Sequence, residues 1–216
     1  MKVLMVNGSA HEAGCTFTAL EEVGKTLNQE GIDYEIFQIG NKPVQECISC
    51  NGCKSEKNNG KGCVFNDDIV NRFAEAAYEA DGFVFGSPVY YGHPTGRMLA
   101  FMDRLFFSRW DGKVYEPFMF KPAAAVVSAR RGGTTATMDA ITKHFGNTQM
   151  ITVGSTYWNN VHGMTPDEVR QDLEGMQCMR NLARNMAWLI KSIEAGKKAG
   201  LNRPESETEY ATNFIR

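Results

Sequence analysis

Four of the six cysteines in the chain follow the pattern Cys47-x2-Cys50-x2-Cys53-x9-Cys63. Thiolates bind iron and zinc, and three of them at intervals of two residues can wrap one face of an iron–sulfur cubane while a fourth arrives from further along. The pattern therefore predicts a metal centre, with a [4Fe–4S] cluster held by these four residues as the first interpretation. Zinc bound by four thiolates and free structural or redox-active thiols are the alternatives.

A second candidate site is the turn Gly8-Ser-Ala-His-Glu-Ala-Gly-Cys-Thr-Phe-Thr18, between an apolar strand-like run and a helix-like stretch. Small and hydroxylated residues there direct backbone N–H groups and hydroxyls toward one point, and the following helix adds the partial positive charge of its N-terminus. The turn contains no Lys or Arg and matches neither the P-loop pattern nor G-x-G-x-x-G. It therefore predicts a phosphate site made of neutral donors.

The segment Ser87-Pro-Val-Tyr-Tyr-Gly-His-Pro-Thr-Gly96 follows the apolar run at 82–86. Tyr90 and Tyr91 offer aromatic faces, and Gly92 allows the backbone to approach a ligand closely. A flat, mostly apolar slot with backbone amides along it is suited to an isoalloxazine ring. We expect this segment to hold the ring of a flavin.

Two later loops add polar groups to the same predicted site. In Ser128-Ala-Arg-Arg-Gly-Gly-Thr134, Arg130 or Arg131 could stabilise negative charge near N1 and O2 of a reduced flavin. In Tyr157-Trp-Asn-Asn-Val-His-Gly163, His162 is the candidate acid–base residue on the substrate side. His162 and Arg131 are therefore the two candidate catalytic residues.

The elements that must position these loops alternate along the chain. Apolar runs predict strands at about 2–7, 33–38, 82–86, 123–128 and 150–156, and amphipathic stretches predict helices at about 16–30, 67–80, 95–107, 135–145 and 165–195. Asn66 or Asp67 is the expected cap of the second helix, and Thr165-Pro-Asp-Glu168 is a capping box for the last. This alternation predicts a doubly wound, five-stranded parallel sheet in the order 2-1-3-4-5 with helices on both faces.

Composition limits the class of protein. The chain has 216 residues, 43% of them hydrophobic and 22% charged, with a formal net charge of -2. We expect one domain over 1–195, with a cysteine-rich insertion at 40–65, and a C-terminal tail at 196–216. The near-neutral charge gives no reason to bind nucleic acid or an anionic membrane. No apolar stretch approaches the roughly 18 residues of a membrane span, so we expect a cytoplasmic protein.

Six short motifs resemble the NADPH-dependent FMN reductase branch of the flavodoxin-like superfamily. They are Asn7-Gly-Ser9, Gly14-Cys-Thr16, Asp67-Asp68, Ala80-Asp-Gly82, Gly86-Ser-Pro-Val-Tyr90 and Phe101-Met-Asp-Arg104. The cysteine segment is similar to that of iron–sulfur flavoproteins. The chain departs from the pattern at Ala10-His-Glu, where relatives often carry Pro and basic residues, and at Cys15, where Asn is common.

The resemblance implies a flavodoxin-like fold, non-covalent FMN and reduction by NAD(P)H. The phosphate would be held by Ser9, Cys15, Thr16, Phe17 and Thr18. The ring would be held by Ser87, Pro88, Val89, Tyr90, Tyr91 and Gly92, with Ser128, Arg130, Arg131, Gly132 and Gly133 from the next loop.

We therefore expect an oxidoreductase that passes hydride from NAD(P)H to FMN and on to a quinone, a nitro or azo compound, free flavin or a similar small acceptor. The alternative is an electron carrier that moves single electrons between protein partners through flavin and cluster. A homodimer or homotetramer is also expected, because aromatic residues crowd one stretch: Phe106, Phe107, Trp110, Tyr115, Phe118 and Phe120.

Overall fold

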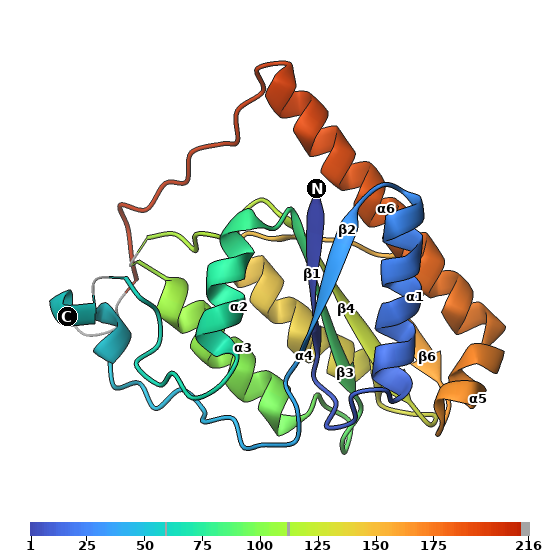
Figure 1. The fold of residues 1–216 in the computed structure, drawn as a ribbon. Helices are drawn as coiled ribbons and strands as arrows, with labels where there is room; N and C mark the ends of the chain where they lie inside the picture. The colour runs from blue at the N-terminus through green and yellow to red at the C-terminus, as the bar shows by residue number, and fades with distance from the viewer. Residues whose placement is uncertain (59, 112, 213–216) are drawn as a thin grey trace.

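A parallel sheet lies between two layers of helices in the computed structural model, which describes residues 1–58, 60–111 and 113–212 (Figure 1). The six strands are β1 (Lys2–Asn7), β2 (Asp33–Gln38), β3 (Gly82–Pro88), β4 (Pro122–Ala129), β5 (Ile151–Thr152) and β6 (Asn160–His162). They lie in the order β2-β1-β3-β4-β5, and β6 also pairs with β4. The predicted α/β class and the order 2-1-3-4-5 are confirmed.

The central strands are apolar over nearly their whole length because helices cover both faces of the sheet. The edge strand β2 instead alternates between exposed and less exposed residues. Asn7 pairs with Gly86, and Pro88 pairs with Ser128, so the carboxyl ends of β1, β3 and β4 align at one edge of the sheet. The loops that follow these strands must therefore meet there.

Six α-helices cover the described part of the sheet, three on each face. One layer contains α1 (Cys15–Gln29), α5 (Pro166–Gln171) and α6 (Leu173–Lys198), and the other contains α2 (Val70–Ala76), α3 (Gly96–Arg109) and α4 (Thr134–Asn147) (Figure 1). Each layer has its own hydrophobic core against the sheet. Short 3-10 helices lie at 52–54, 56–58 and 77–79.

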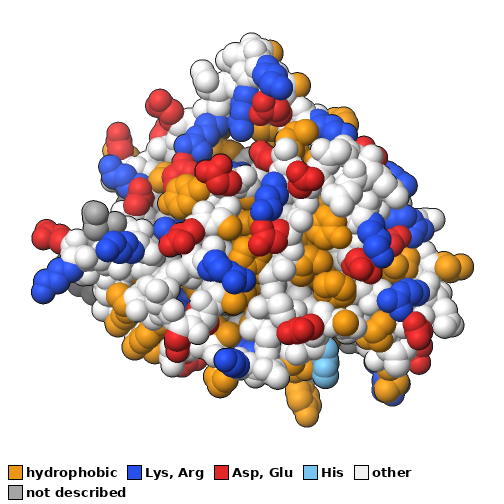
Figure 2. All heavy atoms as spheres, in the orientation of Figure 1, with side chains coloured by type: hydrophobic (Ala, Val, Ile, Leu, Met, Phe, Trp, Pro, Cys, Tyr) orange, Lys and Arg blue, Asp and Glu red, His pale blue; other side chains and the backbone are white. Residues whose placement is uncertain are grey.

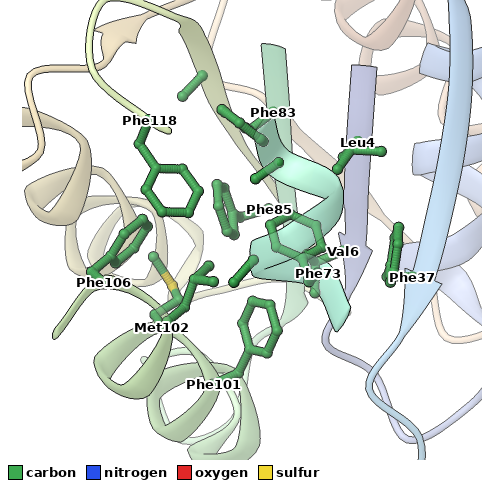
Figure 3. Packing of buried hydrophobic residues seen from close by; sticks show 14 of the residues in the cluster. Leu4, Val6, Phe37, Phe73, Phe83, Phe85, Phe101, Met102, Phe106 and Phe118 are labelled. Atoms are coloured by element: carbon green, nitrogen blue, oxygen red, sulfur yellow. The ribbon is translucent and has the colours of Figure 1, made fainter. Parts of the chain in front are cut away.

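The core under α2 and α3 is rich in phenylalanine. The ring of Phe73 lies 5.1 Å from that of Phe37 and 5.4 Å from that of Phe101, both edge-on (Figure 3). Phe85 lies 6.1 Å away. Edge-to-face packing of this kind stabilises a core beyond the area that it buries. The core therefore fixes α2 and α3 firmly on the sheet.

Three predicted elements differ from the observed ones. The second helix begins at Val70 with Ile69 at its N-cap, so the predicted cap at Asn66 or Asp67 is wrong; Asp68 instead accepts a hydrogen bond from Val70 N at 3.0 Å. The predicted last helix is two helices. They are separated at Asp172, whose side chain accepts from Gly175 N at 2.9 Å and so starts α6.

The predicted fifth strand at 150–156 is the third difference. Only Ile151 and Thr152 form β5, and the chain then leaves the sheet before returning at 160–162 as β6. Part of the loop predicted at 157–163 is therefore a strand beside the carboxyl end of β4.

The predicted aromatic stretch divides between core and surface. Phe106 and Phe118 are buried and pack edge-to-face with their ring centroids 5.0 Å apart, whereas Trp110 is exposed. The first two are therefore core residues rather than part of a subunit seam, and the homo-oligomer stays a prediction.

The surface is mixed in charge. In Figure 2, Lys and Arg side chains are interspersed with Asp and Glu over the face shown. After α6 the chain crosses to the other layer of helices, where Arg203 forms an ion pair with Glu116 and Gln149 Nε2 donates to Ser206 Oγ at 3.0 Å (Figure 1). None of the helices in the described ranges is both long and apolar enough to cross a membrane.

Candidate functional site

The loops after β1, β3 and β4 are tied together at the carboxyl edge of the sheet. Gly8 N donates to Gly86 O at 2.8 Å, which joins the first loop to the end of β3. Thr95 Oγ1 donates to Gly8 O at 2.9 Å. Val89 N donates to Ser128 O at 2.9 Å, which joins the β3 loop to β4. The structure thus brings the three predicted ligand loops into one place.

The first loop is ordered by side-chain amides. Ser9 N donates to Asn7 Oδ1 at 3.1 Å, and Gln38 Nε2 on β2 donates to Ser9 O at 2.7 Å. Ser9 Oγ accepts from His11 N at 3.1 Å. Asn7 and Gln38 were not predicted as site residues, although Gln38 ends a strand beside β1. They act as supports that fix the shape of the loop.

The start of α1 offers donors for an anion. Its N-cap is Gly14, which has no side chain to accept from the first backbone amides of the helix. Such amides, together with the positive end of the helix, favour a negatively charged group. Thr18 Oγ1 donates back to Gly14 O at 3.1 Å, so its hydroxyl is engaged within the turn.

Cys15 and Thr16, at the start of α1, contact two different segments. Cys15 Sγ is 3.7 Å from Gly163 O beyond β6, and burial raises the pKa of its thiol. The nearly fully buried Thr16 hydroxyl lies 2.8 Å from the hydroxyl of Ser128. Phe17 is half-buried on the same helix. The contacts of Cys15 and Thr16 fix the start of α1, where the phosphate is predicted to bind, to the segment after β6 and to the end of β4.

The predicted ring loop forms a tight turn after β3. Tyr91 and Gly92 both have positive φ angles, 51° and 83°, and the turn is closed by Tyr90 N donating to His93 O at 2.9 Å. Both tyrosine side chains are exposed, Tyr91 fully so. Aromatic faces are therefore available to solvent at this edge of the molecule.

The loop after β4 packs closely on that turn. A Cβ atom at Gly133, whose φ is +89°, would lie 2.8 Å from Val89 Cγ1 and 3.0 Å from Gly92 Cα. Only glycine fits such a position without moving the turn. Ser87 Oγ accepts from Thr95 N at 3.1 Å and donates to Pro88 O at 2.9 Å, so it fixes the start of the β3 loop.

The two candidate catalytic residues lie at the same end of β4. Arg131 is exposed, as is its neighbour Arg130, and the Arg131 carbonyl is 3.2 Å from His162 Nε2. His162 is part of β6, where its backbone N–H donates to Asp172 Oδ2 at 2.7 Å. The catalytic roles of Arg131 and His162 stay predictions.

The cysteine segment lies beside α3 rather than at the sheet edge. Cys47, Cys50, Cys53 and Cys63 line one pocket, which they share with Arg104 and Phe107 of α3. All six cysteines are free thiols. Burial raises the pKa of the Cys53 thiol by more than the positive charge of nearby Lys54 lowers it. Among the described residues, no group of three His, Cys, Asp or Glu side chains is arranged to hold a single metal ion.

Arg104 is the polar centre of this pocket. Its Nε donates to Cys63 Sγ at 3.2 Å, and its Nη2 donates to Phe65 O at 2.8 Å. Its Nη1 forms an ion pair with Asp68 and donates to Gln45 O at 3.2 Å. Burial lowers the pKa of this guanidinium, but the hydrogen bonds to Cys63 and Asp68 outweigh it and the pKa is raised. Arg104 therefore stays charged inside the protein.

Two more side chains join the segment to the helices. Asn71 Oδ1 accepts from Cys63 N at 2.9 Å while Asn71 Nδ2 donates to Cys63 O at 2.8 Å. Lys54 Nζ donates to Phe107 O at 2.5 Å and to Trp110 O at the C-terminal end of α3. Asp68 and Arg104 appeared in the sequence only as parts of motifs, and nothing there marked Asn71. Their roles depend on contacts between segments far apart in the chain.

This sheet, with the predicted ligand loops at the switch in strand order, defines a flavodoxin-like α/β protein. The chain belongs to the NADPH-dependent FMN reductase family, whose family model matches residues 1–165. An iron-sulfur flavoprotein of Methanocaldococcus jannaschii is 32% identical over 199 residues, which cover 90% of this chain and 100% of that one. The protein is accordingly a flavoprotein of the oxidoreductase class with FMN as its cofactor.

Solved structures agree on the fold. An NAD(P)H:quinone oxidoreductase from Methanothermobacter marburgensis superposes with a TM-score of 0.63 at 18% identity, covering 86% of this chain and 96% of that one. A flavodoxin from the domain Archaea superposes with a TM-score of 0.57 at 16% identity, covering 88% of this chain and 99% of that one. The family model and the 32% identical relative confirm the resemblance to the FMN reductase branch, whereas the individual FMN contacts stay predictions.

Proposed function

We propose that this protein is an iron–sulfur flavoprotein, an oxidoreductase that exchanges electrons between FMN at the sheet edge and a [4Fe–4S] cluster in the cysteine pocket. The observation that carries the proposal is that all four cysteines of the sequence pattern line one pocket. The relative that is 32% identical to this chain is itself described as an iron-sulfur flavoprotein. FMN supplies two-electron and one-electron chemistry when bound, and a cluster supplies one-electron chemistry.

The residues at the sheet edge fit FMN. The uncapped amides at the start of α1 suit its phosphate, with the Ser9 to Thr18 turn around it. The turn at Tyr90 to Gly92 and the glycine-rich loop at 132–133 suit its ring, because the turn offers exposed aromatic faces and the two glycines let the backbone approach closely. Arg130 and Arg131 are exposed beside this position and would offset negative charge on the ring.

The residues of the cysteine pocket fit a cluster. Four thiols supply the ligand set of a [4Fe–4S] centre, and no disulfide consumes them. The pocket and the sheet edge are linked by α3, which starts beside the ring loop at Gly96 and reaches the pocket at Arg104. Eight residues of helix separate them by about 12 Å along the axis.

Reduction by NAD(P)H is the second candidate function. It is favoured by the description of the family as NADPH-dependent and by the exposed tyrosines at the sheet edge, where a nicotinamide or a small acceptor could stack. A quinone, a nitro or azo compound or free flavin would then use the same face. In that case the cysteine pocket would serve a separate role.

Anaerobic purification followed by iron, sulfide and flavin analysis tests the first proposal. We expect four irons and one FMN per chain after reconstitution, as set by the ligand pattern. Retention of FMN without iron would overturn it. Titration then separates the two functions: rapid bleaching of the flavin by NADH or NADPH supports the reductase, and reduction through ferredoxin alone supports the carrier.

A further inference from the structure

We propose that Arg104 holds the Cys63 side chain in position as a ligand of the cluster and raises the reduction potential of the cluster through its hydrogen bond to the Cys63 sulfur. The proposal rests on the cluster proposed above. It concerns residues of this chain that neither the motif spacing nor the family description assigns.

Cys63 is separated from the other three cysteines by a long loop. The first three cysteines follow one another at two-residue intervals, whereas nine residues separate Cys53 from Cys63. A loop of that length allows many positions for its end, and ordering it costs conformational entropy. The fourth ligand therefore needs support from outside the loop.

The backbone of Cys63 receives that support from α2. Both its N–H and its C=O are bonded to the side-chain amide of Asn71, at 2.9 Å and 2.8 Å. Within the loop, Asn58 Nδ2 donates to Gly62 O at 2.8 Å and to Cys53 O at 3.2 Å, which draws the two ends together. Cys63 is thus attached to the helical scaffold, whereas Cys50 lies exposed on the loop.

The side chain of Cys63 receives its support from α3. Arg104 Nε lies 3.2 Å from Cys63 Sγ, and the rest of the guanidinium is held by Asp68 and by the carbonyls of Gln45 and Phe65. The guanidinium is buried and engaged on all three nitrogens, so its orientation is fixed. A lysine, with a single ammonium group, could not serve four acceptors in these directions.

A charged hydrogen bond at a ligand sulfur has a definite redox consequence. A cluster becomes more negative by one charge when it gains an electron, and a donor at its sulfur stabilises that state more than the oxidised one. Arg104 therefore raises the midpoint potential. It also holds Cys63 in place before the cluster is loaded.

The test is an anaerobic potentiometric titration of the iron–sulfur signal, with dithionite as the electron donor. Four reconstituted proteins are compared: wild type, Arg104→Gln, Arg104→Lys and Arg109→Gln. Arg109 is a matched control because it lies on α3 and contacts the same loop, donating to Gly60 O at 3.3 Å, without a hydrogen bond to a cysteine among the described residues. Its replacement removes the same charge.

We expect Arg104→Gln to lower the midpoint potential and to lose iron faster than wild type under a chelator. Arg104→Lys should lower the potential less than Arg104→Gln, and Arg109→Gln should stay near wild type. The double variant Arg104→Gln/Asp68→Asn removes both charges of the buried pair and serves if the single variant fails to fold. It should also show a lowered potential, because the charged donor at the Cys63 sulfur is lost while the net charge of the pair is unchanged.

Equal potentials in wild type and in the Arg104 variants, or an equal shift in Arg109→Gln, would overturn the role of Arg104 alone. A wild-type protein that takes up no iron would overturn this inference together with the cluster proposal. The two failures are therefore distinguishable.

Discussion

The hydroxyl of Thr16 lies 2.8 Å from the hydroxyl of Ser128, and both are nearly fully buried. Thr16 is on the first turn of α1 and Ser128 is near the end of β4, so this contact joins two of the predicted ligand loops across the sheet edge. When two hydroxyls form a hydrogen bond, one O–H donates to the other oxygen, and the second O–H can still donate to another group. The pair can therefore both brace the site and donate to a ligand.

Replacing Thr16 with Val should weaken FMN binding by about 1–3 kcal/mol, because the phosphate would lose the hydrogen bond that the Thr16 hydroxyl donates in the proposed site. At about 1.4 kcal/mol per tenfold, this is a rise in Kd of roughly 5- to 150-fold. A fluorescence titration of the apoprotein with FMN measures it. Thr26→Val is the control, since Thr26 Oγ1 only donates to Glu22 O further along α1. Equal affinities in the two variants would remove Thr16 from the site.

Gly133 and Gly132 form a second matched pair. Gly133 has φ +89° and no space for a Cβ atom, whereas a Cβ at Gly132 would meet nothing within 4 Å. We expect Gly133→Ala to displace the Tyr91–Gly92 turn, to lower FMN affinity and to destabilise the fold by about 1 kcal/mol. Gly132→Ala should leave the turn in place and the stability unchanged, because a Cβ atom there has open space. Parallel FMN titrations and urea unfolding curves provide the comparison, and similar behaviour of the two variants would contradict the expected packing.

The buried core allows a test of stability alone. Phe73 packs against Phe37, Phe83, Phe85 and Phe101, so Phe73→Ala should cost about 3–5 kcal/mol of unfolding free energy through the cavity that it leaves. Tyr210 is almost fully exposed, and Tyr210→Ala should stay within about 0.5 kcal/mol of wild type. Urea denaturation of the FMN-free proteins measures both. A loss below about 1 kcal/mol for Phe73→Ala would contradict the packing in Figure 3.

The strands and their order follow from local sequence because the central strands are nearly continuous apolar runs separated by helical periodicity. β1 and β2 lie at the predicted residues, and β3 and β4 extend one or two residues beyond them. The parallel order then places the loops at 8–18, 87–96 and 128–134 at one edge, as predicted from topology alone.

What the sequence could not indicate depends on contacts between distant segments. The predicted cap at Asn66 or Asp67 is not used: Asp68 accepts from Val70 N at the start of α2 and also forms an ion pair with Arg104, 36 positions away. Asp172 looks like an ordinary helical residue but accepts from both His162 N and Gly175 N, which separates α5 from α6. Such side chains satisfy long-range partners that no local pattern shows.

The cysteine pocket gives the last prediction. Cys50 is the exposed member of the four and lies far from the loops at the sheet edge in sequence and topology. Cys50→Ser replaces a soft thiolate with a hydroxyl that binds iron poorly, so the variant should lose its iron while keeping its FMN. Iron and flavin analysis of the anaerobically prepared protein measures both quantities in one sample.

Cys178→Ala is the matched control, because Cys178 lies on the buried face of α6 and is not among the residues that line the pocket. It should retain wild-type iron and flavin. Loss of FMN together with iron in Cys50→Ser would mean that the two sites depend on each other for folding, because α3 touches both the ring loop and the pocket. Full iron content in Cys50→Ser would instead exclude this residue as a ligand and leave the cluster without its expected set of four thiolates.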